Sequence, residues 1–194
     1  MNPKTLFDYQ AFPQLETQRL ILREIRLEDA EAILRIFGDD EVTCYYHLET
    51  FTSIEQTREL IDGMADRFKN KIRVRWGITL KGEDVIIGTC GYPTWVQSQF
   101  LGEIGYDLAQ AYWNRGIMTE ALAAVLQFGF ERMELNRIEA MVMLENTPSM
   151  QLLRKLGFQE EGILREYGFW KGQFHDMKLF SLLRRDFVKM EVVR

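Results

Sequence analysis

The spacing of apolar residues changes along this chain from a helical period to strand alternation and back. Between residues 27 and 38 apolar side chains recur at helical spacing and stop at Gly38, whereas residues 74–80 alternate as in a strand. Residues 119–134 return to a strong helical period. The order is helices, then antiparallel-type strands, then β-α-β-α-β-β. It predicts an α/β (α+β) fold with one mixed sheet and helices on both faces.

The same patterns predict about seven strands and four helices. The strands are expected at residues 20–22, 74–80, 85–93, 100–108, 137–144, 159–170 and 174–183. The helices are expected at 27–38, from the capping-box pattern Ser53–Gln56 to Phe68, at 119–134 and at 148–156. No repeat, low-complexity stretch or Pro/Gly-rich linker divides the 194 residues, so we expect a single domain over 1–194.

Charge and cysteine content narrow the classes of partner. Asp plus Glu number 29 against 24 Lys plus Arg, and this net charge of −5 argues against nucleic acid as the main partner. No apolar run approaches the ~20 residues that span a bilayer, and no signal-peptide pattern opens the chain, so we expect no membrane partner and a cytoplasmic protein. With only Cys44, Cys90, His47 and His175 available, we expect no metal site and take each cysteine as a small apolar filler.

The segment from Tyr106 to Glu120 joins a strand to a helix through a compact loop that contains Gly116. Backbone N–H groups at a helix start, together with the positive end of the helix dipole, form an anion site. Glycine allows a ligand to approach the backbone closely, and Arg115 can add charge. A plain strand-to-helix turn is the alternative. The spacing is neither a Walker A nor a G-x-G-x-x-G pattern.

A second polar segment, Glu145 to Phe158, follows the next strand. Thr147 is suited to cap a short helix, and Gly157 followed by Phe158 is typical of a Schellman ending. Asn146 and Ser149 then lie three residues apart beside the carboxyl end of a strand. Their alternative role is helix capping alone.

In these segments the chain resembles the GNAT N-acetyltransferases, and within them the Rim-type branch that acetylates the N-terminal alanine of ribosomal proteins. The resemblance runs from about residue 15 to residue 183, which implies a domain core of about 15–185 and a GNAT sheet splayed at the cofactor site. It rests on Leu15–Arg23, Glu103–Tyr106, the Tyr-Trp-x-x-Gly-x-x-Thr-Glu-Ala run at 112–121, Asn146-x-x-Ser149 and Lys155-x-Gly157-Phe158.

The resemblance implies acetyl-CoA as cosubstrate, without a metal, and assigns roles to residues. The loop amides would hold the CoA pyrophosphate, the splayed strand Ile104–Leu108 would pair with the pantetheine arm, Asn146 would hydrogen-bond that arm, and Ser149 would lie near the sulfur. The position seven residues after Asn146, where many GNAT enzymes have a tyrosine, is Leu153. The cofactor-binding residues so implied are Ile104, Tyr106, Asn114, Arg115, Gly116, Ile117, Met118, Thr119, Asn146 and Ser149.

The chemistry asks only for a modest base. An α-amino group with a pKa near 7.7–8.0 is already neutral for roughly a tenth of molecules at pH 7. Ser149 and Glu103 are the catalytic candidates: Ser149 would assist the departing thiolate, and Glu103 is one candidate for the base. Other candidates for the base are Glu145, Glu166, His175 and Asp176, although for each acid a solvated carboxylate is the alternative.

An N-terminal peptide α-amine is the expected acceptor, and the sequence favours no particular oligomeric state. The aromatic residues Tyr92, Trp95, Tyr167 and Trp170 are candidates for an acceptor groove, with core or edge packing as the alternative for each. Two alternative functions remain at this point: a small-amine acetyltransferase acting on a polyamine, amino acid or aminoglycoside, and a non-catalytic module that senses acetyl-CoA.

Overall fold

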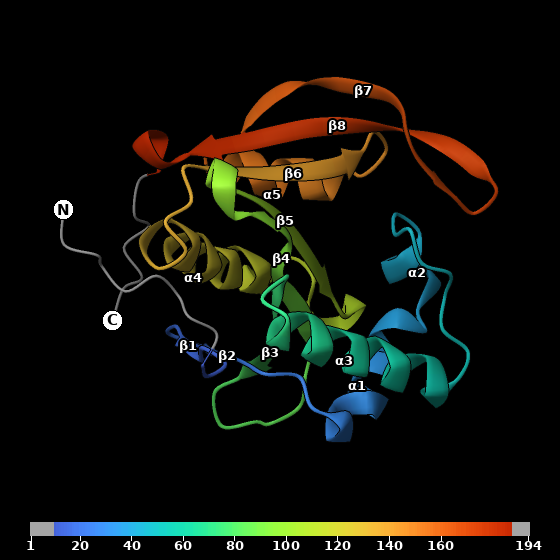
Figure 1. The fold of residues 1–194 in the computed structure, drawn as a ribbon. Helices are drawn as coiled ribbons and strands as arrows, with labels where there is room; N and C mark the ends of the chain where they lie inside the picture. The colour runs from blue at the N-terminus through green and yellow to red at the C-terminus, as the bar shows by residue number, and fades with distance from the viewer. Residues whose placement is uncertain (1–9, 188–194) are drawn as a thin grey trace.

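The computed structural model describes residues 10–187, so the ends of the expected domain, 1–9 and 188–194, lie outside it. One mixed sheet of eight strands, in the order β1-β2-β3-β4-β5-β6-β8-β7, forms its centre (Figure 1). All neighbouring strands are antiparallel except β5 and β6. The strands are β1 Leu15–Glu16, β2 Leu20–Arg23, β3 Val74–Leu80, β4 Gly88–Val96, β5 Leu101–Leu108, β6 Arg137–Met143, β7 Gln159–Trp170 and β8 Gln173–Leu183.

Helices cover both faces of this sheet. The helices are α1 Ala30–Phe37, α2 Asp40–Thr43, α3 Ile54–Lys69, α4 Ile117–Glu131 and α5 Thr147–Lys155, with short 3₁₀ turns at Leu27–Asp29, Gln97–Gln99, Gln110–Tyr112 and Arg184–Asp186. Side chains of α4 and α5 pack into one buried cluster with Trp76, and side chains of α1 and α3 pack into another with Ile86. Successive residues of β3 face opposite clusters, since a Cβ on Gly77 would meet Ile86.

The local signals explain most of these boundaries. Ser53 accepts the Gln56 N–H and the Gln56 side chain accepts the Ser53 N–H, which is the predicted capping box at the start of α3. After α5, Gly157 has φ +88° and the Phe158 N–H reaches the Leu153 carbonyl, as in a Schellman ending.

Three local expectations were wrong or incomplete. The sheet has eight strands instead of about seven, because the two-residue β1 is too short to show alternation. The four-residue α2 is likewise too short for a helical period. Cys44, just after α2, is exposed and therefore does not fill the core, whereas Cys90 is buried as expected.

The parallel pair β5 and β6 separates along its length, which confirms the predicted splay. Residues Leu101–Glu103 of β5 pair with Arg137–Glu139 of β6, and from Ile104 on the described residues show no further pairing between the two strands. On its other side β5 stays paired with β4, which has a register shift between Gly91 and Thr94. The backbone of β5 from Ile104 to Leu108 therefore presents an open edge toward β6.

Candidate active site

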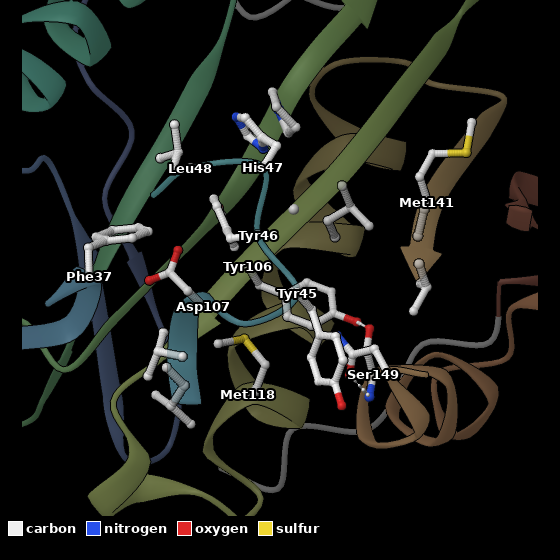
Figure 2. Close-up of a pocket in the computed structure, with 18 of the residues that line it drawn as sticks. Phe37, Tyr45, Tyr46, His47, Leu48, Tyr106, Asp107, Met118, Met141 and Ser149 are labelled. Atoms are coloured by element: carbon white, nitrogen blue, oxygen red, sulfur yellow. Dashed lines mark hydrogen bonds between the residues drawn. The ribbon is translucent and has the colours of Figure 1, made fainter. Parts of the chain in front are cut away.

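A cleft of about 1480 Å³ opens where β5 and β6 separate (Figure 2). Its walls come from strands β5 and β6, the starts of α4 and α5, the segment around α2, the beginning of β3 with the end of α3, and the β7–β8 hairpin. The β7–β8 hairpin extends toward α2 (Figure 1), and there Lys171 Nζ donates to the Thr43 carbonyl at 2.9 Å. Side chains far apart in sequence are thereby gathered around one space.

Helix α4 points its unpaired amides at one end of the cleft. Gly116 is the residue before the helix, has φ +71°, and makes no side-chain cap; the first bond back to it is Glu120 N–H to Gly116 O at 3.1 Å. The N–H groups of Ile117, Met118 and Thr119 consequently have no partner within the helix. These three residues, with Gly116, line the cleft, so the geometry is that of an anion site.

A polar clamp from the turn between β1 and β2 fixes the loop before α4. The Arg19 guanidinium pairs with Glu120 at 2.6 Å and also donates to the Arg115 carbonyl at 3.0 Å. Thr17 donates to the same Glu120 carboxylate. Burial raises the pKa of Glu120, but the hydrogen bonds from Thr17 and Arg19 outweigh it and leave the pKa below its ordinary value. The early Thr17 and Arg19 thus position the predicted anion loop from a hundred residues away.

The hydroxyl groups of Tyr106 in β5 and Ser149 in α5 form a hydrogen bond across the opening of the sheet. Their oxygens lie 2.7 Å apart, as the dashed line in Figure 2 marks. Burial raises the pKa of Tyr106 to about 12, so its hydroxyl stays protonated at neutral pH. Asn146, not Thr147, is the N-cap of α5: its side-chain oxygen accepts the Ser149 N–H at 3.1 Å. The expectation that Thr147 caps the helix was therefore wrong.

Among the acids proposed as bases, Glu103 lines the cleft where β5 and β6 begin to separate. Burial, with a further contribution from Glu139, raises its pKa, although Thr94 donates to it at 3.1 Å. A carboxyl group whose pKa moves toward neutrality is better matched to base catalysis.

The other candidates for the base lie elsewhere. Glu145 and Glu166 are exposed, and Asp176 accepts the Glu166 N–H at 2.8 Å. His175 stacks on Trp170 with ring centroids 4.2 Å apart, and its Nε2 lies 3.2 Å from the Trp170 carbonyl oxygen. None of these four residues is among those that line the cleft within the described part of the chain.

A buried polar network lies under the acceptor side of the cleft. Arg75 donates to Asp107, to Thr89 at 2.7 Å and to the Tyr46 hydroxyl at 2.9 Å. Thr89 in turn donates to Asp107 at 2.7 Å through its hydroxyl. The charge of Asp107 is thereby balanced, so this network is a rigid floor instead of a reactive group.

The segment after α2 is a part of the site that sequence reasoning missed. Tyr45, Tyr46 and His47 line the cleft, and Figure 2 shows them entering it from this segment. Burial lowers the pKa of His47, and the positive charges of Arg75 and Arg73 lower it further, so its imidazole is neutral at pH 7. Only the run of three aromatic rings after a short polar stretch signals this segment.

Of the residues predicted to be catalytic or to bind the cofactor, all but Arg115 line the cleft. Arg115 turns away, its guanidinium 5.6 Å from the Tyr112 ring centre, and its predicted role stays a prediction. Tyr167 and Trp170 line the cleft and Trp95 does not. Tyr92 also borders the cleft, but its side chain is fully buried and its hydroxyl donates to the Val125 carbonyl. The predicted residues that line the cleft are Glu103, Ile104, Tyr106, Asn114, Gly116, Ile117, Met118, Thr119, Asn146 and Ser149.

Residues 10–187 contain neither a metal-binding cluster nor a membrane-spanning helix. No group of three or more His, Cys, Asp or Glu residues is placed to hold a metal ion there. In the same range, no helix has the length and apolar character needed to cross a membrane.

Known proteins are similar to this chain in both sequence and fold. A family model described as an acetyltransferase (GNAT) domain matches residues 19–159. The uncharacterized N-acetyltransferase p20 of Bacillus licheniformis is 42% identical over 173 residues, which cover 89% of this chain and 97% of that protein. The [ribosomal protein uS5]-alanine N-acetyltransferase of Escherichia coli (strain K12) is 29% identical over 187 residues, covering 89% of this chain and 92% of that protein.

A solved structure agrees with these relatives. Mycobacterium smegmatis RimJ in complex with CoA-disulfide matches with a TM-score of 0.79 at 27% identity, over 88% of this chain and 86% of that one. The splayed strands, the open amides of α4 and the match over most of the chain lead to one conclusion: the chain belongs to the GNAT family of acetyltransferases and is an N-acetyltransferase.

Proposed function

We propose that this chain, as one domain over about residues 15–185, is an acetyl-CoA-dependent enzyme that acetylates the N-terminal α-amine of a protein or peptide. Transfer occurs by direct attack in a ternary complex. The observation that carries the proposal is the open edge of β5 beyond Glu103, which has the unpaired amides of α4 at one end and the Tyr106–Ser149 pair beside it.

The residues of the cleft fit CoA along this edge. Backbone N–H groups of Ile117, Met118 and Thr119 bind the pyrophosphate oxygens, where glycine at 116 leaves the approach free. The unpaired backbone of β5 from Ile104 hydrogen-bonds the amides of the pantetheine arm, as a strand binds a strand. The side-chain oxygen of Asn146 already accepts the Ser149 N–H at the helix cap, so its NH₂ group is the part that can donate to that arm.

The same groups provide the chemistry. Glu103 takes a proton from the amine, whose nitrogen forms a bond to the thioester carbon while the carbon–sulfur bond breaks. Backbone N–H groups of the open β5 edge stabilise the negative charge that develops on the carbonyl oxygen. Ser149 donates a hydrogen bond to the departing thiolate, and the Tyr106 hydroxyl donates to Ser149 behind it.

Two considerations support a terminal α-amine as acceptor. An α-amine with a pKa near 7.7–8.0 needs only modest help from a base, whereas a lysine side chain near 10.4 needs much more. The name of the Escherichia coli relative also specifies alanine of a ribosomal protein as its substrate.

Two measurements test the proposal. A ligand that binds only the native state at 100 times its Kd adds about 2.7 kcal/mol of stability, so saturating acetyl-CoA should raise Tm by several degrees. Thiol release from acetyl-CoA, measured with a panel of short peptides, polyamines and free amino acids, should be fastest with peptides. An unchanged Tm would refute the cofactor assignment, and binding without release by any acceptor would favour a sensing module.

A further inference from the structure

Three arginines line the wall of the cleft that β3 and α3 provide: Arg67 near the end of α3, Arg73 just before β3, and Arg75 within it. Arg75 is paired with Asp107. Among the described residues, Arg67 and Arg73 form no ion pair. Helix α3 contributes one acid to the lining of the cleft, Glu59. Glu59 precedes Arg67 by eight residues, which is about 12 Å along an α-helix. Among residues 10–187, no ion pair neutralises the positive charge of Arg67 and Arg73, and Glu103 is the acid close enough to act on the pKa of Arg73.

Arg73 is the least satisfied of the three. Its Nε–H is buried and has no acceptor among residues 10–187. A buried donor without a partner is unfavourable, so the side chain gains free energy by turning its Nε and Nη groups toward an acceptor. Burial lowers the pKa of Arg73, and Arg67 and Arg75 lower it further, while Glu103 acts in the opposite sense. The unpartnered Nε–H of Arg73, with Arg67 and Arg75 on the same wall, favours an anion at this place.

Arg73 lies near the reacting end of the cleft. It precedes Val74, which pairs with Tyr92 of β4, and Thr94 of β4 pairs with Glu103 of β5. Arg73 and Glu103 are thus two strands apart, about 10 Å between backbones at the usual strand spacing, and both side chains line the cleft between them. An amine held at Glu103 would place a group a few bonds away within reach of the Arg73 guanidinium.

The anion that Arg73 can bind is not the pyrophosphate of CoA. The amides of α4 lie beyond the carboxyl end of β5, whereas Glu103 lies near its beginning. The five residue steps from Glu103 to Leu108 span about 17 Å of extended strand. A dianionic phosphate is also disfavoured, because Glu103 is close enough to Arg73 to act on its pKa. A single carboxylate fits the local charge best.

We propose that Arg73, supported by Arg67, binds a carboxylate of the acceptor, so that the preferred substrate is an α-amine with an acidic group on its first or second residue. The inference rests on the proposed function and adds the substrate class of the same site. The planar guanidinium fork makes two parallel hydrogen bonds to a carboxylate, which fixes orientation as well as adding affinity. Glu103 at one end and Arg73 at the other would then align the amine for attack.

Binding to the CoA-saturated protein tests this without turnover. The probes are amidated peptide pairs that differ in one charge: Asp-Gly-Gly against Asn-Gly-Gly, and Ala-Asp-Gly against Ala-Asn-Gly. We expect calorimetry to give the acidic member of at least one pair an affinity about tenfold to a hundredfold higher. Free alanine against alaninamide shows whether an α-carboxylate serves equally well, as it would for a free amino acid acceptor.

Arginine variants assign the preference to its residue. Arg73→Gln should remove the preference, Arg73→Lys should keep a small part of it because the charge stays and the fork is lost, and the exposed Arg58→Gln on the same helix as Arg67 should keep all of it. Circular dichroism of each variant checks that it is folded. Equal affinities within every pair, a preference that survives Arg73→Gln, or no binding of any probe would each overturn the inference.

The two proposals fail in different measurements. Charge-selective binding that depends on Arg73, combined with no thiol release by any acceptor, would leave the carboxylate site standing and remove the transferase reaction. Thiol release that proceeds equally well with acidic and neutral peptides would support the transferase reaction and remove the carboxylate site.

Discussion

The two ends of the cleft are built in different ways. At the cofactor end the groups that point into the cleft are mostly backbone: the open edge of β5 and the amides of α4 after Gly116. At the acceptor end they are side chains from distant segments, such as Tyr46 after α2, Arg73 before β3 and Trp170 in the hairpin. A backbone site needs a particular turn, cap and glycine at fixed spacing, whereas a side-chain site needs only that the fold bring its members together.

The supports of the two ends differ accordingly. One clamp, Arg19 with Glu120, holds the loop of the cofactor end through a single carbonyl of the backbone. The acceptor end rests on the buried Arg75–Asp107 pair, whose hydrogen bonds extend to Thr89 and Tyr46. Substitutions at the two ends should therefore separate cleanly into effects on CoA and effects on the acceptor or the chemical step.

The largest effect is expected at Glu103, between the two ends. Glu103→Gln removes the proposed base and should lower kcat by about 10²–10⁴-fold while the Kd of CoA stays near that of the wild type. Steady-state kinetics with a peptide acceptor, beside calorimetry with CoA, measure both. Wild-type kcat in this variant would exclude Glu103 from the reaction.

The raised pKa of Glu103 adds a stability readout with a definite sign. Because its folded pKa lies above the unfolded value, its favourable contribution to stability is full below the unfolded pKa and is lost as pH rises through the folded pKa. Above that pH the wild type has a buried charge that Glu103→Gln lacks, so the variant should melt at an equal or higher temperature. A clear drop in Tm at pH 8 would contradict this account.

The next largest effect on kcat is expected at the hydrogen-bonded hydroxyl groups of Ser149 and Tyr106. Ser149→Ala should lower kcat about tenfold to a hundredfold, because a hydrogen bond to the developing thiolate is worth about 1.5–3 kcal/mol. Tyr106→Phe acts through Ser149 and should lower kcat less. The exposed Ser98→Ala is a matched control. Since Tyr106 keeps its proton up to about pH 12, its loss should not move the pH profile. Reduced Tm with full activity in Ser149→Ala would identify the serine as a helix residue only.

The sequence allowed most of the fold to be predicted because its long elements are strongly periodic. Residues 159–170 and 173–183 form the closing hairpin within a residue of expectation, and the helix expected at 119–134 is Ile117–Glu131. The elements that were missed, β1 and α2, hold too few residues for any period to appear, and the strand expected at 85–93 is shifted to Gly88–Val96.

The two ends of the cleft also differ in how far the sequence predicts them. The cofactor end was predictable, since Gly116 and Asn146 lie at a helix start and a helix cap that the sequence signals. The Tyr106–Ser149 contact joins residues 43 positions apart, and Arg75 meets Asp107 across 32, so neither contact leaves a local pattern. Thr147 was mistaken for the cap because Asn and Thr are both good caps and only the backbone distinguishes them.

Substituting Gly116 at the cofactor end, with Gly82 as a control, tests whether the amides of α4 bind CoA. Gly116→Val puts a branched side chain at φ +71° beside the anion site, and the Kd of CoA should rise on the order of tenfold. Gly82→Val is the matched control, because Gly82 has φ +87° in a turn with open space around it, outside the cleft. Both variants carry left-handed strain of about 1–2 kcal/mol, so their Tm values should fall alike. An equal change in CoA affinity in both would show that strain, not position, matters.

The smallest effect on kinetics is expected at Lys171, where the β7–β8 hairpin contacts the segment after α2. Lys171 in the hairpin turn donates to the Thr43 carbonyl at 2.9 Å and so holds the hairpin over the segment that carries Tyr45, Tyr46 and His47. A single net hydrogen bond of about 0.5–1.5 kcal/mol corresponds to about a twofold to tenfold change, so Lys171→Met should raise the KM for a peptide acceptor by that factor. The cofactor end does not depend on this contact, and the Kd of CoA should be unchanged. Lys69→Met, an exposed lysine at the end of α3, controls for the lost charge. A change in CoA affinity without a change in acceptor KM would mean that the hairpin supports the cofactor end, and the separation of the two ends would fail.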